Sequence, residues 1–216
     1  NETAGVLLRF FELGLAATLF PGIRCTTEVR RRILAVRDTL TWARRSWPDA
    51  RPQPQVMYLA AIMLNLPFQA ARHLCRRLRL PKEITQHVLA ALEMLPKAAA
   101  ELDTGIPRPS RLDQWFDGHP VETLLLLPVL KNNSGSWRSI CEYWEKIRHI
   151  KTFINGHDLQ NLGLSPGPRF QSVLQAIRAA RLDGLVQNRQ EELTLAAELI
   201  AADPNREENP VVRGNH

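Results

Sequence analysis

The chain has 216 residues, enough for one large or two small domains. Lysine and arginine number 28 against 22 acidic residues, and the net charge of +6 favours nucleic acid or another anionic surface as a partner. Cys25, Cys75 and Cys141 form no CxxC pair, which argues against a disulfide framework and a zinc site and favours a reducing, cytoplasmic location. The apolar run from Val121 to Leu127 is too short to span a bilayer, and no signal peptide opens the chain, so no membrane partner is expected.

Nearly every segment has helical periodicity and almost none alternates, which predicts an all-α fold. The first predicted helix has Val29, Ile33, Val36 and Leu40 on one face. Prolines in residues 48–55 interrupt the chain before an apolar, central segment. A multi-helical body followed by a tail of capped helices is therefore expected.

A basic helix is predicted from Pro67 to Leu80. Arg72, Arg76 and Arg79 are four and three residues apart, so they are expected to form one stripe on it. No acid lies four residues away within this helix to neutralise them. The stripe is a candidate RNA-binding surface, and a solvated helix face is the alternative.

The segment 103–110 mixes glycine, proline and turn formers, and it is the clearest boundary in the chain. We expect a helical body-like region at 1–105, a helical tail-like region at 106–202 and a polar extension at 203–216. The chain begins with Asn1 rather than methionine, and we expect it to be part of a longer protein.

Three helices are predicted between residues 153 and 201 from their N-caps and supporting residues, namely Asn155 with Asp158, Ser165 with Pro166, and Asn188 with Glu191. Gly163 and Gly184 lie where the first two of these helices must end.

The loop before the second tail helix is a candidate phosphate site, because it offers backbone N–H groups beside an arginine. The candidate RNA-binding residues of the tail are Gly163, Gly167, Arg169, Arg178, Arg181 and Arg189. A capped helix turn packed against the core is the alternative interpretation.

No catalytic motif is recognisable: the chain has no Walker loop, no GxSxG and no suitably placed pair of carboxylates. His157 and Asp158 lack the further ligands of a metal site, and Asp158 is explained by its capping role. We therefore expect neither catalytic nor metal-ligating residues in this chain.

The stretches INGHDLQNLGLSPGPRF (154–170) and LDGLVQNRQEEL (182–193) resemble the tail of bacterial class II tRNA nucleotidyltransferases and their poly(A) polymerase relatives. The residues that match the family pattern are Gly156, Asp158, Leu159, Leu162, Gly163, Pro166, Gly167, Pro168 and Arg189. Two positions depart from it, because Gln171 stands where a glycine is common and Gln190 stands where a glutamate usually follows the arginine. The resemblance is specific over these stretches and loose elsewhere.

The resemblance implies the body and tail of such an enzyme, which hold RNA, in the first place tRNA, while a head domain adds nucleotides to its 3′ end. That head would require Mg²⁺ and a nucleoside triphosphate, and no match for it is found here; no cofactor is expected in this part. Two alternatives remain, a helix-hairpin-helix-like DNA-binding module and a helical interaction scaffold. Nothing in the sequence predicts the oligomeric state.

Overall fold

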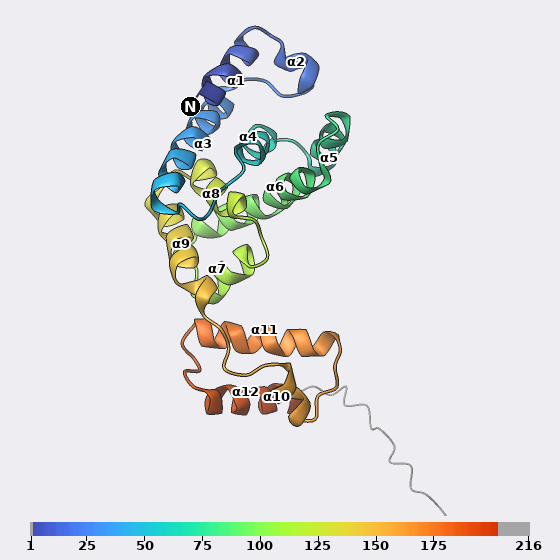
Figure 1. Cartoon of the computed structure of the whole chain (residues 1–216), viewed down its shortest axis with the longest axis vertical. Helices are drawn as coiled ribbons and strands as arrows, with labels where there is room; N and C mark the ends of the chain where they lie inside the picture. The colour runs from blue at the N-terminus through green and yellow to red at the C-terminus, as the bar shows by residue number, and fades with distance from the viewer. Residues whose placement is uncertain (1, 203–216) are drawn as a thin grey trace, which may run out of the picture. The chain divides into compact units, whose positions relative to one another are not determined.

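The computed structural model describes residues 2–202 and divides the chain into two compact units, residues 1–148 and residues from 149 onward (Figure 1). Every regular element in the described part is helical, which confirms the all-α prediction. The boundary expected at residue 105 lies inside the first unit, between two of its helices, and the predicted extension at 203–216 lies outside the described residues.

The helices of the first unit are α1 (Glu2–Glu12), α2 (Ala16–Leu19), α3 (Thr27–Ser46), α4 (Pro54–Met63), α5 (Phe68–Arg77), α6 (Lys82–Leu102), α7 (Pro109–Phe116), α8 (Val121–Leu130) and α9 (Ser134–Glu145), followed by the short helix η1 (Ile147–His149). The helix at the centre of this unit is α8, which packs against α3, α4, α6 and α9. All four leucines from Leu124 to Leu127 are buried, as expected of a helix that is apolar on every side.

The long helix α3 begins where its N-cap Thr26 accepts a hydrogen bond from the N–H of Val29. The apolar face predicted for this helix is buried, with Ile33 among its fully buried side chains. Arg31 donates to the carbonyl oxygens of Val129 and Leu130, and so satisfies the C-terminal carbonyls of α8. Hydrophobic packing and this arginine together join α3 to the central helix.

The second unit consists of α10 (Gly156–Asn161), α11 (Pro168–Leu182) and α12 (Arg189–Ala201) around a small apolar core. The capping box of Asn155 and Asp158 is present as predicted. Asn188 caps α12, although the carboxylate of Glu191 accepts hydrogen bonds from the N–H of Gln187 and the side-chain amide of Asn188 rather than from the backbone N–H of Asn188.

Gly163 and Gly184 end α10 and α11 with positive φ angles of 86° and 74°, so both predicted helix stops are confirmed. The N-cap predicted at Ser165 is wrong, because α11 begins at Pro168 with Gly167 as its N-cap. The ring of Pro168 disfavours a helical conformation for the preceding residue, and Gly167 is accordingly extended.

Gly156, at the start of α10, lies against Phe170 of α11. A Cβ atom at this position would be 2.7 Å from Cε1 of Phe170, whose ring packs against the core of the second unit. We expect Gly156→Ala to lower the free energy of unfolding by about 1–3 kcal/mol, because the ring must move within a packed core. Chemical denaturation followed by circular dichroism measures the change, and Gly135→Ala, with no atom closer than 3.5 Å, is the control. Equal stability of the two variants would contradict the expectation.

Candidate nucleic-acid interface

The basic helix α5 exposes one face and buries the other. Ala71, Leu74 and Cys75 are buried against the unit, and this leaves Arg72 and Arg76, one turn apart, exposed on the outer side. Neither arginine has a hydrogen bond or salt bridge to another residue between 2 and 202. The four-residue spacing of Arg72 and Arg76 thus correctly predicted that both lie on the same exposed face of α5.

Arg79 does not lie on this helix, which ends at Arg77 rather than at the predicted Leu80. The N–H of Leu80 donates to the carbonyl of Cys75, and Arg79 has a φ of 52°. This is the geometry of a Schellman motif, in which the left-handed position is usually a glycine. Arg79 therefore belongs to the turn after α5, where its exposed side chain adds to the positive charge near the helix end.

Replacing Arg79 by glycine is expected to raise the free energy of unfolding by about 0.5–1 kcal/mol, because glycine adopts the left-handed conformation without the steric cost of a Cβ atom. Arg79→Ala retains that cost and is the matched control, since it removes the same charge. Thermal unfolding of the two variants measures the difference. A glycine variant no more stable than the alanine variant would show that the turn is not strained.

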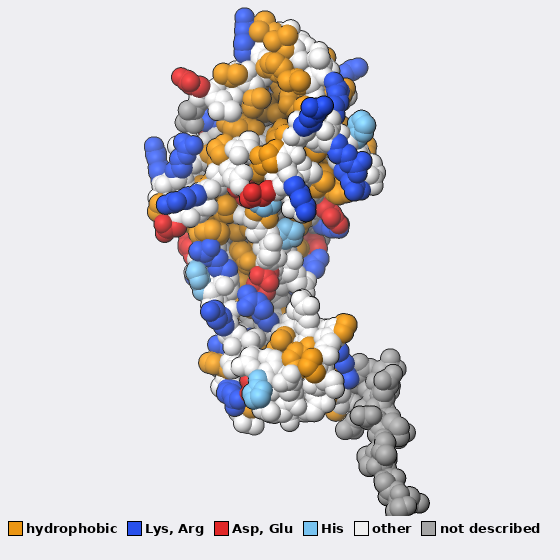
Figure 2. Space-filling view, turned by 45° about the vertical axis from the view of Figure 1, so that its right-hand side comes forward, with side chains coloured by type: hydrophobic (Ala, Val, Ile, Leu, Met, Phe, Trp, Pro, Cys, Tyr) orange, Lys and Arg blue, Asp and Glu red, His pale blue; other side chains and the backbone are white. Residues whose placement is uncertain are grey.

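The sequence around α5 is free of acidic residues. No aspartate or glutamate lies between Asp49 and Glu83, whereas Arg77 and Lys82 add to the arginines already described. Arg77 donates to the carbonyl of Thr18 and fastens α5 to α2. Figure 2 shows basic side chains gathered over this side of the first unit.

The positive charge of the chain lies in the first unit. Residues 1–148 carry 21 lysines and arginines against 14 acids, a net charge of +7, whereas residues 149–202 carry five of each and are neutral. The exposed bases without a hydrogen bond or salt bridge to residues 2–202 are Arg24, Arg44, Arg45, Arg51, Arg72, Arg76, Arg79, Lys82, Arg108, Arg138 and Lys146 in the first unit and Lys151 in the second. Sequence reasoning singled out only three of them.

Two arginines of the second unit bind backbone carbonyls. Arg169 donates to the carbonyl oxygen of Ile200 at 2.8 Å, at the C-terminal end of α12, where a cation also interacts favourably with the helix dipole. Arg178 donates to the carbonyl oxygen of Ile150 at 2.6 Å and so holds the segment that precedes α10. Both side chains are half-buried. Each of them stabilises the second unit.

Arg181 takes part in a buried ion pair that the sequence analysis missed. Its Nη1 lies 3.2 Å from Oε1 of Glu192, whose side chain is fully buried, and its guanidinium lies 3.8 Å from the ring centroid of Phe153. The other carboxylate oxygen of Glu192 accepts the N–H groups of Phe153 and Ile154 at 2.7 and 3.0 Å. Glu192 thus joins α11, α12 and the segment before α10.

Arg189 is the most exposed of the tail arginines, with 58% of its side chain accessible, and it pairs with Asp158 at 2.5 Å. Gly163 and Gly167 lie in the loop before α11, and Gly167 provides no side-chain acceptor for the first turn of that helix. The loop and Arg189 are accessible, whereas the other tail arginines are largely engaged inside the unit. RNA binding by these tail residues stays a prediction.

Four of the five tryptophans form one cluster between α3 and α9. The ring centroids are 4.8 Å apart for Trp42 and Trp47, 4.6 Å for Trp42 and Trp137, and 5.0 Å for Trp47 and Trp144. The guanidinium of Arg148 lies 3.5 Å from the ring centroid of Trp144. Only Trp47 is buried, so the cluster is partly exposed.

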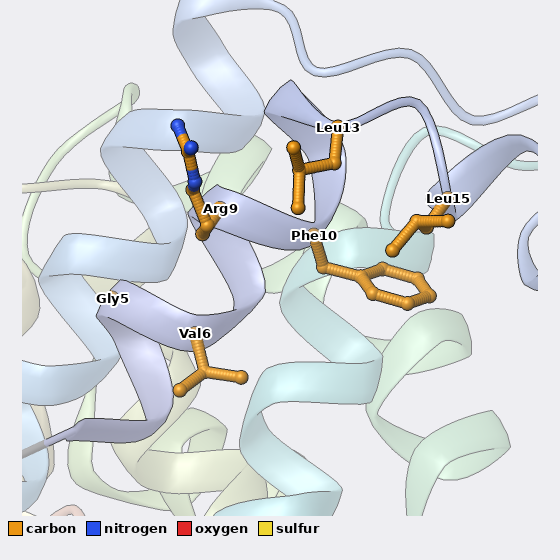
Figure 3. Close-up of a pocket in the computed structure, with 6 residues that line it drawn as sticks. All are labelled: Gly5, Val6, Arg9, Phe10, Leu13 and Leu15. Atoms are coloured by element: carbon orange, nitrogen blue, oxygen red, sulfur yellow. The ribbon is translucent and has the colours of Figure 1, made fainter.

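One recess beside α1 is apolar and distinct from these basic surfaces. It has a volume of about 360 Å³ and is lined by Gly5, Val6, Arg9, Phe10, Leu13 and Leu15 (Figure 3). Figure 3 shows Phe10, Leu13 and Leu15 near one another, while the side chain of Arg9 extends away. The recess offers little to a phosphate, and we do not include it in the interface.

Within residues 2–202, no group of three or more His, Cys, Asp and Glu side chains could hold a metal ion. No helix in the same part of the chain has both the length and the apolarity to cross a membrane.

Comparison with known proteins agrees with the resemblance noted in residues 154–193. The family model of tRNA nucleotidyltransferase domain 2 matches residues 52–197. The A-adding tRNA nucleotidyltransferase of Geobacter sulfurreducens is 25% identical over 206 residues, which cover 92% of this chain and 23% of that protein.

Two solved structures share the fold. The Thermotoga maritima CCA-adding enzyme complexed with tRNA has a TM-score of 0.71 at 18% identity, and the match covers 92% of this chain and 47% of that one. A CCA-adding enzyme in complex with ATP has a TM-score of 0.73 at 16% identity, over 92% and 46% of the two chains. The chain thus spans less than half the length of these relatives. Because the family model covers more than half of its residues, the chain belongs to the tRNA nucleotidyltransferase domain 2 family.

Proposed function

We propose that this chain holds RNA, and in the first place tRNA, for a tRNA nucleotidyltransferase or poly(A) polymerase by contacting the phosphate backbone through the basic surface of its first unit. The observation that supports this proposal most strongly is the exposed, unneutralised charge around α5, in a stretch with no acid between Asp49 and Glu83. Arginine suits phosphate because its planar guanidinium donates two parallel hydrogen bonds. The relatives, which are a tRNA nucleotidyltransferase and CCA-adding enzymes, support the same substrate.

The chemistry of nucleotide addition is proposed for a part of the protein outside the match. The relatives are more than twice as long as the matched region, and the sequence of this chain contains no recognisable catalytic motif. Mg²⁺ and a nucleoside triphosphate would act there, and we assign no step of the reaction to residues of this chain. A cytoplasmic location accords with this role and with the free cysteines Cys25, Cys75 and Cys141.

Recognition by backbone contacts predicts a preference for shape and charge rather than sequence. An A-form helix displays its phosphates and 2′-hydroxyls but hides the major-groove edges of its bases in a deep, narrow groove. The tail loop at 162–168 and Arg189 would add contacts to such a helix, whereas the arginines bound to Ile200, Ile150 and Glu192 would act by keeping the second unit folded.

The test is to compare binding of this chain to full tRNA, to a minihelix with only the stacked acceptor and T arms, and to duplex DNA of equal length at one ionic strength. We expect tRNA and minihelix to bind alike and DNA to bind more weakly. Stronger binding to DNA would favour a helix-hairpin-helix-like DNA-binding module. Absence of binding to all three would favour an interaction scaffold, and either result would overturn the proposal.

A further inference from the structure

We propose that the partly exposed ring of Trp137, beside Arg138 and the first turn of α9, stacks on an unpaired base of a single-stranded RNA segment. This inference rests on the proposed RNA-binding function and deepens it, because holding a helical backbone needs phosphate contacts alone. It adds a second class of contact, made to the face of a base.

Trp137 is partly exposed and has a single aromatic partner in the described part of the chain. Its only ring contact within residues 2–202 is with Trp42, at an interplanar angle of 65°, so the two rings meet edge to face rather than stacked. Trp144, in contrast, is stacked on Trp47 and also carries the guanidinium of Arg148. Among the exposed rings of the cluster, Trp137 is therefore the one best placed to accept a base.

The rest of the cluster holds this ring in place. Trp42 is fixed by its edge contact with Trp47, which is buried and whose indole N–H lies 3.5 Å from Oε1 of Glu145. A ring held by packing loses little conformational freedom when a ligand binds, so more of the stacking free energy appears as affinity. The tryptophan cluster thus provides a preorganised platform.

Positive charge lies beside the platform, as a nucleotide's phosphate requires. Arg138 follows Trp137 directly, and Arg45 lies one turn after Trp42 on α3; both are exposed and have no hydrogen bond or salt bridge to residues 2–202. The N-cap Asn133 accepts the N–H of Ser136. The positive end of the helix dipole also lies in this first turn.

An accessible tryptophan ring beside exposed arginines favours the binding of unpaired nucleotides. Bases inside a duplex are already stacked on their neighbours, so a protein ring reaches a base face only in a single strand, a loop or an end. Aromatic stacking beside a basic surface binds single strands with little sequence preference, since every base has a π-face. The ligand class is therefore single-stranded RNA rather than a mononucleotide of one kind.

The experiment measures binding of the whole 216-residue chain to the unstructured oligonucleotide (rU)₁₀ and to the RNA minihelix, using fluorescently labelled RNA. We expect Trp137→Ala to weaken binding of (rU)₁₀ about tenfold, within the range found for loss of one stacked base, and to leave minihelix binding within about twofold. Trp137→Phe retains an aromatic face and should stay within about threefold of the wild type. Ile106→Ala, which removes another exposed apolar side chain of the first unit, is the control and should change neither.

Intrinsic fluorescence gives an independent readout if Trp137→Ala fails to fold. Stacking of a base on Trp137 should quench the emission of the wild type on addition of (rU)₁₀, and Trp137→Phe should bind with less quenching. An unquenched wild type, or equal loss of (rU)₁₀ and minihelix binding in a folded Trp137→Ala variant, would overturn the inference. Minihelix binding without any binding of (rU)₁₀ would overturn the inference alone, whereas failure to bind either RNA would overturn the proposed function as well.

Discussion

Replacing Glu192 by alanine is expected to lower the free energy of unfolding of the second unit by about 3–5 kcal/mol, because it leaves Arg181 largely buried without its counter-ion. The same change leaves the N–H groups of Phe153 and Ile154 without an acceptor. Glu192→Gln keeps the shape and one acceptor oxygen, so its effect should be smaller.

Two optical signals separate the units in this experiment. All five tryptophans lie in residues 1–148, so their fluorescence reports on the first unit, whereas circular dichroism reports on the helices of both. We expect the dichroism of Glu192→Ala to decrease at lower denaturant concentration than that of Glu198→Ala, an exposed position on the same helix. If the two variants unfold alike, the buried carboxylate does not organise the second unit.

Reversing the charge of the two exposed arginines of α5 that have no partner in the described part, Arg72→Glu with Arg76→Glu, is expected to weaken tRNA binding about 10- to 100-fold at moderate salt. The change removes two candidate phosphate contacts and places two carboxylates where phosphate would lie, and like charges at a binding surface cost several kcal/mol in affinity. Both side chains are exposed and without salt bridges in the described part, so the fold should be retained. Fluorescence anisotropy with labelled tRNA measures the loss.

The matched control changes the net charge equally at other exposed sites of the first unit. Arg9→Glu with Lys97→Glu also lowers the net charge by four, at positions where each base already faces a glutamate. If the control weakens binding as much as the α5 variant, net charge rather than the α5 surface decides the affinity. Arg169 and Arg178 are unsuitable for this test, because charge reversal there would also break hydrogen bonds to Ile200 and Ile150.

Local features of the fold could be predicted because residues close in sequence determine them. The cap at Asn155 and the stops at Gly163 and Gly184 each depend on a few neighbouring residues, and the structure confirms them. The wrong prediction of an N-cap at Ser165 also concerned neighbouring residues, since Pro168 disfavours a helical conformation for Gly167. The restriction that Pro168 places on the preceding residue predicts the observed start of α11.

The partners of the tail arginines could not be predicted, because they are distant in sequence and many are backbone carbonyls. Arg169 is 31 residues from Ile200, and Arg178 is 28 residues from Ile150. Every residue has a backbone carbonyl, so the sequence does not show which carbonyl accepts a hydrogen bond. An arginine that binds a carbonyl therefore cannot be distinguished in the sequence from an arginine that faces solvent. Glu192 gave a weak signal as an acid within an otherwise buried helix face, but its two N–H partners are again backbone groups.

The sequence predicted which arginines are exposed together only where the spacing along one helix determines their positions. Arg72 and Arg76 are exposed together as the four-residue spacing requires, whereas Arg79 was misplaced because the chain leaves the helix two residues earlier. The concentration of net charge in the first unit follows from the sequence only after the boundary at residue 148 is known.

The central claim is that this chain binds RNA through its phosphates, and the salt dependence of tRNA binding tests it most directly. Each phosphate contact releases counter-ions and lowers the logarithm of the affinity by about 0.7 to 0.9 per tenfold rise in salt. Three to five contacts by the exposed arginines therefore predict a slope of about −2 to −4.5 for the wild type. A tRNA affinity that does not change between low and moderate salt would contradict the account.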